Sequence, residues 1–120
     1  MDKHATVLFA HGSRDPLWSR PIEAVAARMQ AIEPQCVVRC AYLELTQPDL
    51  AAVIAELAVA GITTVCVLPM FLGVGRHARQ DLPALVAPLV LQYPDMTISL
   101  RPAIGEDPQV IDLLARTALG

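Results

Sequence analysis

A chain of 120 residues is the size of one compact domain, so we expect residues 1–120 to form a single domain with one core. Its residues are 54% hydrophobic and only 18% charged, which argues against a disordered chain. The net charge of −3, with 9 basic residues scattered singly, leaves no basic stripe for a phosphate backbone, so no nucleic-acid partner is expected.

No apolar run reaches the roughly eighteen residues that a membrane span requires, and the first polar turn comes too early for a signal peptide. We therefore expect a cytoplasmic protein with no membrane partner. Cys36, Cys40 and Cys66 form neither an even set nor a CxxC pair. This pattern predicts buried free cysteines in strands, and it supports neither disulfides nor a thiolate zinc site.

The first half of the chain alternates between strand and helix patterns. Residues 5–10 form a short apolar run, which is typical of a strand buried on both faces. A helix follows Pro21 and runs to about Glu33, where Pro34 stops it. A second strand is predicted from Gln35 to about Leu43 or Glu44, because this segment is rich in β-branched and aromatic residues.

The second half repeats the alternation. Thr46 is predicted to cap an alanine-rich helix over 48–60 that ends at Gly61, in a left-handed conformation. Further elements follow in chain order: a strand within 62–71, a glycine loop leading into a helix with Pro83 in its first turn, a strand over 96–100, and a helix over 107–119. Four strand–helix units predict an α/β fold of three layers, with helices on both faces of a four-stranded parallel sheet.

Polar residues follow three of the predicted strands. Because parallel strands point their carboxyl ends to one edge, His11, Glu44 and His77 should lie along the same rim of the sheet. Two imidazoles and a carboxylate suit a borderline divalent metal such as cobalt, nickel, iron or zinc better than magnesium or calcium. The alternative is that each histidine is a turn residue bonded to backbone and that Glu44 is a solvated carboxylate.

The loops around the histidines allow other functions. The glycine loop at 73–76 suggests a phosphate cradle, but it fits neither GxGxxG nor GxxxxGK[ST], so nucleotide binding rests on the fold alone. Ser13 lacks the G-x-S-x-G elbow of a hydrolase and is predicted to be a turn or cap residue. Arg14, Arg76 and Arg79 suit a substrate with several carboxylates, although local salt bridges to Asp15 and Asp81 are an alternative.

Apolar residues also follow the third predicted strand. Met70, Phe71, Leu72 and Val74 are candidates for an apolar wall beside a flat ligand, with core packing or an oligomer contact as the default interpretation.

Three ordered motifs together resemble one known family. HGSRDP at 11–16, ELTQPDL at 44–50 and PMFLGVGRHARQDLP at 69–83 are similar to the class II tetrapyrrole chelatases, in particular the short CbiX-type sirohydrochlorin chelatases. The resemblance implies a chelatase-like fold, which is a flavodoxin-like half domain. It also implies insertion of Co²⁺, or of Fe²⁺ or Ni²⁺, into the octacarboxylate sirohydrochlorin during cobalamin or sirohaem biosynthesis. No ATP or cofactor beyond the metal substrate is implied.

The resemblance also assigns roles to individual positions. His11 and His77 match the two metal-binding histidines, and Glu44 matches a glutamate linked to metal or to proton handling. These three residues are therefore the predicted catalytic and metal-binding set. Substrate binding is assigned to the remaining polar and glycine positions of the motifs: Ser13, Arg14, Gly73, Gly75, Arg76 and Arg79.

Chain length is where the sequence departs from longer members of this family, which hold two such domains with the substrate cleft between them. The resemblance therefore implies a homodimer whose active site lies in the intersubunit cleft and contains both copies of His11 and His77. Two other functions stay open: a non-catalytic metal-binding or metal-delivery protein that uses the same histidines, and a small nucleotide-binding module.

Overall fold

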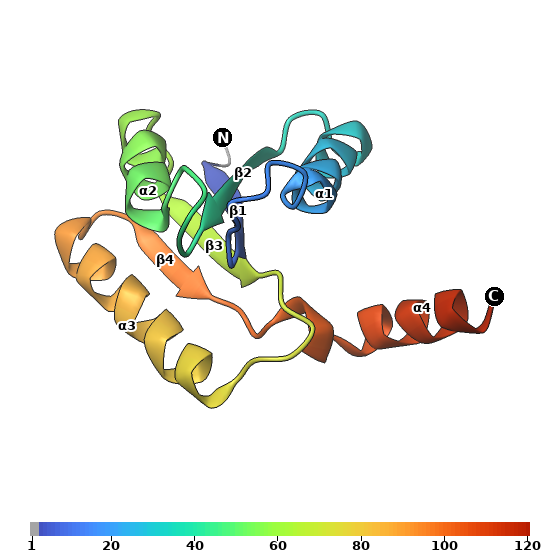
Figure 1. The fold of residues 1–120 in the computed structure, drawn as a ribbon. Helices are drawn as coiled ribbons and strands as arrows, with labels where there is room; N and C mark the ends of the chain where they lie inside the picture. The colour runs from blue at the N-terminus through green and yellow to red at the C-terminus, as the bar shows by residue number, and fades with distance from the viewer. Residues whose placement is uncertain (1–2) are drawn as a thin grey trace.

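The computed structural model describes residues 3–120, except for the side chains of His77 and Ala78, and it contains one parallel sheet (Figure 1). The sheet has the strand order β2-β1-β3-β4. Its strands are β1 (His4–Ala10), β2 (Val37–Tyr42), β3 (Thr64–Pro69) and β4 (Thr97–Leu100). The predicted α/β fold with a four-stranded parallel sheet is confirmed, and all four carboxyl ends reach the same edge.

Helices lie on both sides of this sheet. They are α1 (Arg20–Ile32), α2 (Leu50–Val59), α3 (Arg76–Gln92) and α4 (Pro108–Leu119), with a short 3₁₀ helix η1 (Ile104–Glu106) before α4. Figure 1 shows α2 and α3 on one side of the sheet and α1 on the other. Helix α4 forms where it was predicted, but it extends away from the sheet and makes its main contacts with η1 (Figure 1).

The larger core lies between the sheet and the helices α2 and α3. Alternate residues of β1 point into it, and Val7 and Phe9 are 0% and 1% exposed. Leu8 points to the opposite side, where it packs with Val38 and Leu68 beneath α1. A parallel strand that is buried on both faces explains why the 5–10 run is continuously apolar.

Two helix starts differ from the sequence predictions. Asp49, not Thr46, caps α2, because its carboxylate accepts a hydrogen bond of 2.8 Å from the Ala52 N–H. Helix α3 begins at Arg76, so Pro83 lies inside the helix and not in its first turn. Gly75 supplies the extended N-cap conformation, and the alanine, arginine and glutamine residues that follow are good helix formers.

The predicted conformation at the end of α2 is confirmed, whereas the predicted burial of the three cysteines in strands is wrong in part, since none is fully buried and Cys36 precedes β2. Gly61 has a φ of 82°, the left-handed conformation predicted at the end of α2. All three cysteines are free, and each is half-buried rather than fully buried. Burial and the nearby Glu23 carboxylate raise the pKa of the Cys40 thiol, which disfavours a thiolate there. No helix in the described part of the chain is both long and apolar enough to cross a membrane.

The α2 interface provides a direct test of this core. Ile54 is 0% exposed, so Ile54→Ala should lower the free energy of unfolding by about 2–5 kcal/mol through lost contacts and a residual cavity. Val59 is on the same helix but 91% exposed, and Val59→Ala should change it by less than about 0.5 kcal/mol. Urea unfolding followed by circular dichroism measures both, and equal losses would contradict the described packing.

Candidate functional site

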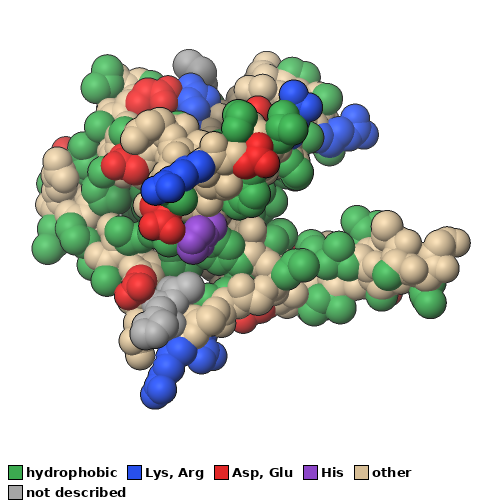
Figure 2. Space-filling model, viewed as in Figure 1, with side chains coloured by type: hydrophobic (Ala, Val, Ile, Leu, Met, Phe, Trp, Pro, Cys, Tyr) green, Lys and Arg blue, Asp and Glu red, His purple; other side chains and the backbone are tan. Residues whose placement is uncertain are grey.

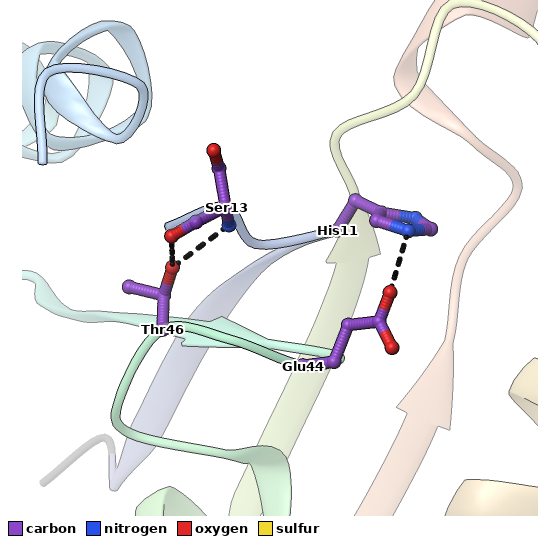
Figure 3. A network of polar contacts seen from close by, with 4 residues as sticks. All are labelled: His11, Ser13, Glu44 and Thr46. Carbon is purple, nitrogen blue, oxygen red and sulfur yellow. Dashed lines mark hydrogen bonds and ion pairs between the residues drawn. The ribbon is translucent and has the colours of Figure 1, made fainter. Parts of the chain in front are cut away.

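His11 and Glu44 lie side by side because β1 and β2 continue to pair beyond their ends. The Leu43 N–H donates to the Ala10 carbonyl at 2.9 Å, and the Glu44 N–H donates to the His11 carbonyl at 3.0 Å. The two side chains meet above this backbone, with His11 Nε2 lying 3.2 Å from Glu44 Oε1 (Figure 3). Two of the three predicted rim residues are therefore in direct contact.

The contact between these side chains indicates which imidazole nitrogen is available for chemistry. A carboxylate only accepts hydrogen bonds, so the Nε2–H of His11 is the donor toward Glu44. In the neutral ring this leaves the Nδ1 lone pair for a metal ion or a proton. The two side chains are 58% and 56% exposed, which leaves both accessible to a substrate at the rim.

Gly12 allows the two loops to approach this closely. Its φ of 105° is one that residues with a side chain rarely adopt, and a Cβ built at this position would overlap the carbonyl oxygen of Glu44. The glycine of the first motif is therefore a structural requirement of the pairing between the loops that carry His11 and Glu44.

The side chain of Thr46 joins the same two loops by hydrogen bonds to Ser13, beyond the contact between His11 and Glu44. Its hydroxyl accepts a hydrogen bond of 3.0 Å from the Ser13 N–H and donates one of 2.9 Å to the Ser13 carbonyl (Figure 3). The Ser13 hydroxyl accepts from the Asp15 N–H at 3.1 Å, so Ser13 is a turn residue as the sequence predicts. The Ser13 hydroxyl, which was assigned to substrate binding, therefore already accepts a hydrogen bond within the turn.

A hollow of approximately 330 Å³ opens beside His11. Leu43, Phe71 and Leu82 form its apolar wall, and Asp81 contributes a carboxylate. Gly73 and Gly75 also line it, and among the described atoms outside their chain neighbours none lies within 4 Å of where a Cβ would be on either glycine. Because the glycines have no side chains, they leave the hollow open on their side. Its lining combines apolar surface with a few polar groups, as ligand sites do.

The loop that carries these glycines is held at its base. The Phe71 ring packs edge-to-face against Phe9, with 6.5 Å between the ring centroids. The Phe71 carbonyl accepts a hydrogen bond of 3.0 Å from the Gly105 N–H. A Cβ on Gly105 would overlap the backbone of Leu72, so η1 packs directly against the loop.

The apolar residues after β3 divide between core and rim. Phe71 lines the hollow as an apolar wall, whereas Met70 packs with the buried cluster beneath α1. Leu72 is 71% exposed on the loop. The predicted wall therefore rests on Phe71 together with Leu43 and Leu82 from the neighbouring segments.

Arg14, Arg76 and Arg79 are exposed in the two motif segments. The ion pairs of the described side chains join His11 with Glu44, Arg39 with Glu56, and Arg116 with Asp112. The alternative prediction of salt bridges to Asp15 and Asp81 is therefore wrong for the described side chains. Figure 2 shows Lys and Arg side chains as separate protrusions rather than as one continuous basic patch.

His77 occupies the second position of α3, and its side chain lies outside the described residues. Its predicted proximity to His11 and Glu44 stays a prediction. Among the side chains that the structure describes, no group of three or more His, Cys, Asp or Glu residues is placed to hold a metal ion. Of the three predicted metal-binding residues, the structure thus describes the side chains of His11 and Glu44.

Comparison with known proteins identifies the family. The family model of CbiX matches residues 5–119. The chain belongs to the CbiX family. A similar curated protein is the sirohydrochlorin cobaltochelatase of Methanopyrus kandleri, which is 29% identical over 68% of this chain and 57% of its own. The CbiX chain described here therefore spans less than two thirds of that relative's length.

Two solved structures resemble the whole CbiX fold. A cobalamin biosynthesis CbiX protein from Marinobacter aquaeolei has a TM-score of 0.83 at 33% identity, covering 97% of this chain and 93% of that one. The sirohydrochlorin chelatase SirB from Bacillus subtilis subspecies spizizenii, in complex with cobalt, has a TM-score of 0.80 at 26% identity. That match covers 98% of this chain and only 50% of SirB.

Two residues of the CbiX site were assigned other roles from the sequence. Thr46 was predicted to be a helix cap, although its hydroxyl joins the two loops. Asp81 was considered only as a salt-bridge partner, yet it lines the hollow. Recognising that α3 begins at Arg76 would have placed Asp81 within the helix that borders the glycine loop.

The link between the loops can be tested at Thr46. Thr46→Val removes the hydroxyl and leaves the Ser13 N–H and carbonyl without their partner, so the free energy of unfolding should fall by about 1–3 kcal/mol. Thr46→Ser keeps a hydroxyl and should stay closer to the parent. Urea unfolding measures both variants, and a Thr46→Val loss no larger than that of Thr46→Ser would show that these bonds do not hold the loops.

Proposed function

We propose that this protein is a sirohydrochlorin chelatase that inserts a divalent metal, with Co²⁺ as the first candidate and Fe²⁺ and Ni²⁺ as alternatives. The observation that carries the proposal is the His11–Glu44 pair at the mouth of the hollow. It is supported by the cobaltochelatase name of the Methanopyrus kandleri relative and by the cobalt in the SirB structure. The reaction needs no cofactor beyond the metal, and its proposed location is the cytoplasm.

Metal insertion requires one group to deliver the ion and another to remove protons. Two pyrrole N–H protons leave the macrocycle as the divalent ion forms bonds to the ring nitrogens. The Nδ1 lone pair of His11 can hold the ion or accept a proton, and Glu44 stabilises the imidazolium that results. His77 completes the proposed catalytic and metal-binding set.

The hollow and the arginines suit a flat polycarboxylate. The apolar wall of Leu43, Phe71 and Leu82 matches the face of a macrocycle. The absence of side chains at Gly73 and Gly75 leaves room for the macrocycle to enter. Guanidinium groups of Arg14, Arg76 and Arg79 bind peripheral carboxylates through paired hydrogen bonds. Each is exposed at a motif segment that borders the site.

The size of the hollow supports a dimeric site. A volume of approximately 330 Å³ is at the small end for a drug-sized ligand, and an octacarboxylate tetrapyrrole is larger than such a ligand. A second chain would supply the opposite wall, with its own His11 and His77. SirB, of which this chain covers 50%, has the length to provide both walls in one chain.

Metalation assays with sirohydrochlorin and Co²⁺ test the assigned residues. His11→Ala and His77→Ala should each lower the rate by about 10²–10⁴-fold, as expected for loss of a group that handles protons. Glu44→Gln should lower it by about 10–100-fold, because it removes the carboxylate that supports His11 and belongs to the proposed metal-binding set. Glu56→Gln, which breaks the remote pair with Arg39, is the control and should keep the parent rate. Near-normal rates in both histidine variants would contradict the assignment.

The same assay separates this proposal from the other candidate functions. A metal-delivery protein would bind Co²⁺ through His11 without changing the absorption spectrum of sirohydrochlorin. A nucleotide-binding module would bind nucleotides and be indifferent to metal. Running Co²⁺, Fe²⁺ and Ni²⁺ in parallel gives the metal preference, which affinity order and supply decide more than ligand geometry does.

The arginines should affect substrate affinity more than turnover. Arg14→Gln, Arg76→Gln and Arg79→Gln should each raise KM for sirohydrochlorin by about 2–5-fold, the range expected for an exposed ion pair, with kcat nearly unchanged. The effect should shrink at high salt because exposed charges are screened. Arg28→Gln, on the exposed side of α1, is the control. An unchanged KM in all three variants would exclude them as carboxylate ligands.

A further inference from the structure

Leu45 has an unusual backbone conformation between Glu44 and Thr46. Its φ of 63° makes it the one non-glycine residue in the described part of the chain that lies in the left-handed region. The Thr46 N–H donates a hydrogen bond of 2.7 Å to the Glu44 carbonyl, which closes a tight turn centred on Leu45. In this conformation the Cβ of a leucine crowds the backbone, so the turn is strained where a glycine would be relaxed.

The loop that carries His11 holds this turn on both sides of Leu45. Before it, the Glu44 N–H donates to the His11 carbonyl at 3.0 Å. After it, the Thr46 hydroxyl bonds to both the N–H and the carbonyl of Ser13 (Figure 3). Because these contacts fix the residues on either side, the surrounding structure keeps Leu45 in its strained conformation.

The Leu45 side chain gains little from its own chain in return. The residue is 57% exposed, and it packs against neither of the two buried hydrophobic clusters of the described residues. An exposed leucine needs no explanation by itself, but an exposed leucine in a strained conformation does. A glycine would make the same turn with less strain, so the benefit of the leucine side chain must come from a contact outside the folded chain.

The hollow beside this turn leaves part of the proposed substrate uncovered. At approximately 330 Å³ it is too small for an octacarboxylate tetrapyrrole, so part of the macrocycle must lie on the rim around it. Leu43 lines the hollow, and the next residue, Glu44, is directed to His11. Leu45 follows on the other side of Glu44, so the rim carries an apolar residue before and after the carboxylate.

We propose that Leu45 is a substrate-binding residue that packs against the apolar face of the tetrapyrrole beside the His11–Glu44 pair. The turn holds the leucine at the rim before the substrate arrives, so less conformational freedom is lost on binding. This contact lies outside the hollow and differs from the carboxylate contacts assigned to the arginines. It rests on the proposed function, because the ligand is the same macrocycle.

Titration with metal-free sirohydrochlorin, followed by its absorption spectrum, tests Leu45 without metal insertion. Leu45→Asn places a polar residue that tolerates the left-handed region, and it should raise Kd by about 5–50-fold with a urea midpoint no lower than that of the parent. Leu45→Gly also fits the turn and should behave alike, whereas Leu45→Met should retain most of the affinity. Leu91→Asn alters an exposed leucine at the far end of α3 and should keep the parent Kd.

The outcomes separate this contact from the proposed function. A parent-like Kd in Leu45→Asn and Leu45→Gly would overturn the contact alone. A lower urea midpoint in both variants, or a change in their oligomeric state by light scattering, would also overturn it, because the leucine would then serve the fold or a second chain. A parent that binds sirohydrochlorin without metalating it, together with weakened binding in both variants, would support the contact and count against metal insertion alone. A parent that does not bind sirohydrochlorin would contradict both.

Discussion

The candidate site depends on the pairing of β1 with β2 beyond the ends of both strands. Two further backbone hydrogen bonds carry the register onward to His11 and Glu44, so the side chains meet without help from any flexible segment. This pairing is possible only because Gly12 has no side chain to strike the Glu44 carbonyl. The His11 imidazole and its carboxylate partner are thus positioned by main-chain geometry, which is stiffer than a contact between two mobile side chains.

The two faces of the sheet contribute differently to the molecule. The face toward α2 and α3 holds the larger core, with Ile54 and Leu57 fully buried, and supplies the stability on which the rim depends. The face toward α1 has a smaller buried cluster around Leu8 and an open row of small residues beyond it. The described helices therefore cover the two faces of the sheet to different extents.

The sequence predicted which residues lie at the carboxyl edge of the sheet, but it did not predict the side-chain contacts that they make there. Strand ends and parallel topology placed His11 and Glu44 together, because the alternation of apolar runs and helices allows few other arrangements. Thr46 could not be assigned in this way, since a threonine before a helix suits either a cap or a distant loop, and only the folded position of Ser13 decides. For α3, Pro83 suggested a late start, although a proline can be accommodated inside a helix. The sequence likewise predicted a helix over 107–119 without indicating which surface it would pack against.

The contact of Gly105 with the loop after β3 connects two parts of the molecule that are otherwise far apart in role. The same short turn of η1 supports the loop that lines the hollow and fixes the direction in which α4 leaves the body. A change in the position of η1 would therefore alter both the direction of α4 and the backbone of the loop that lines the hollow.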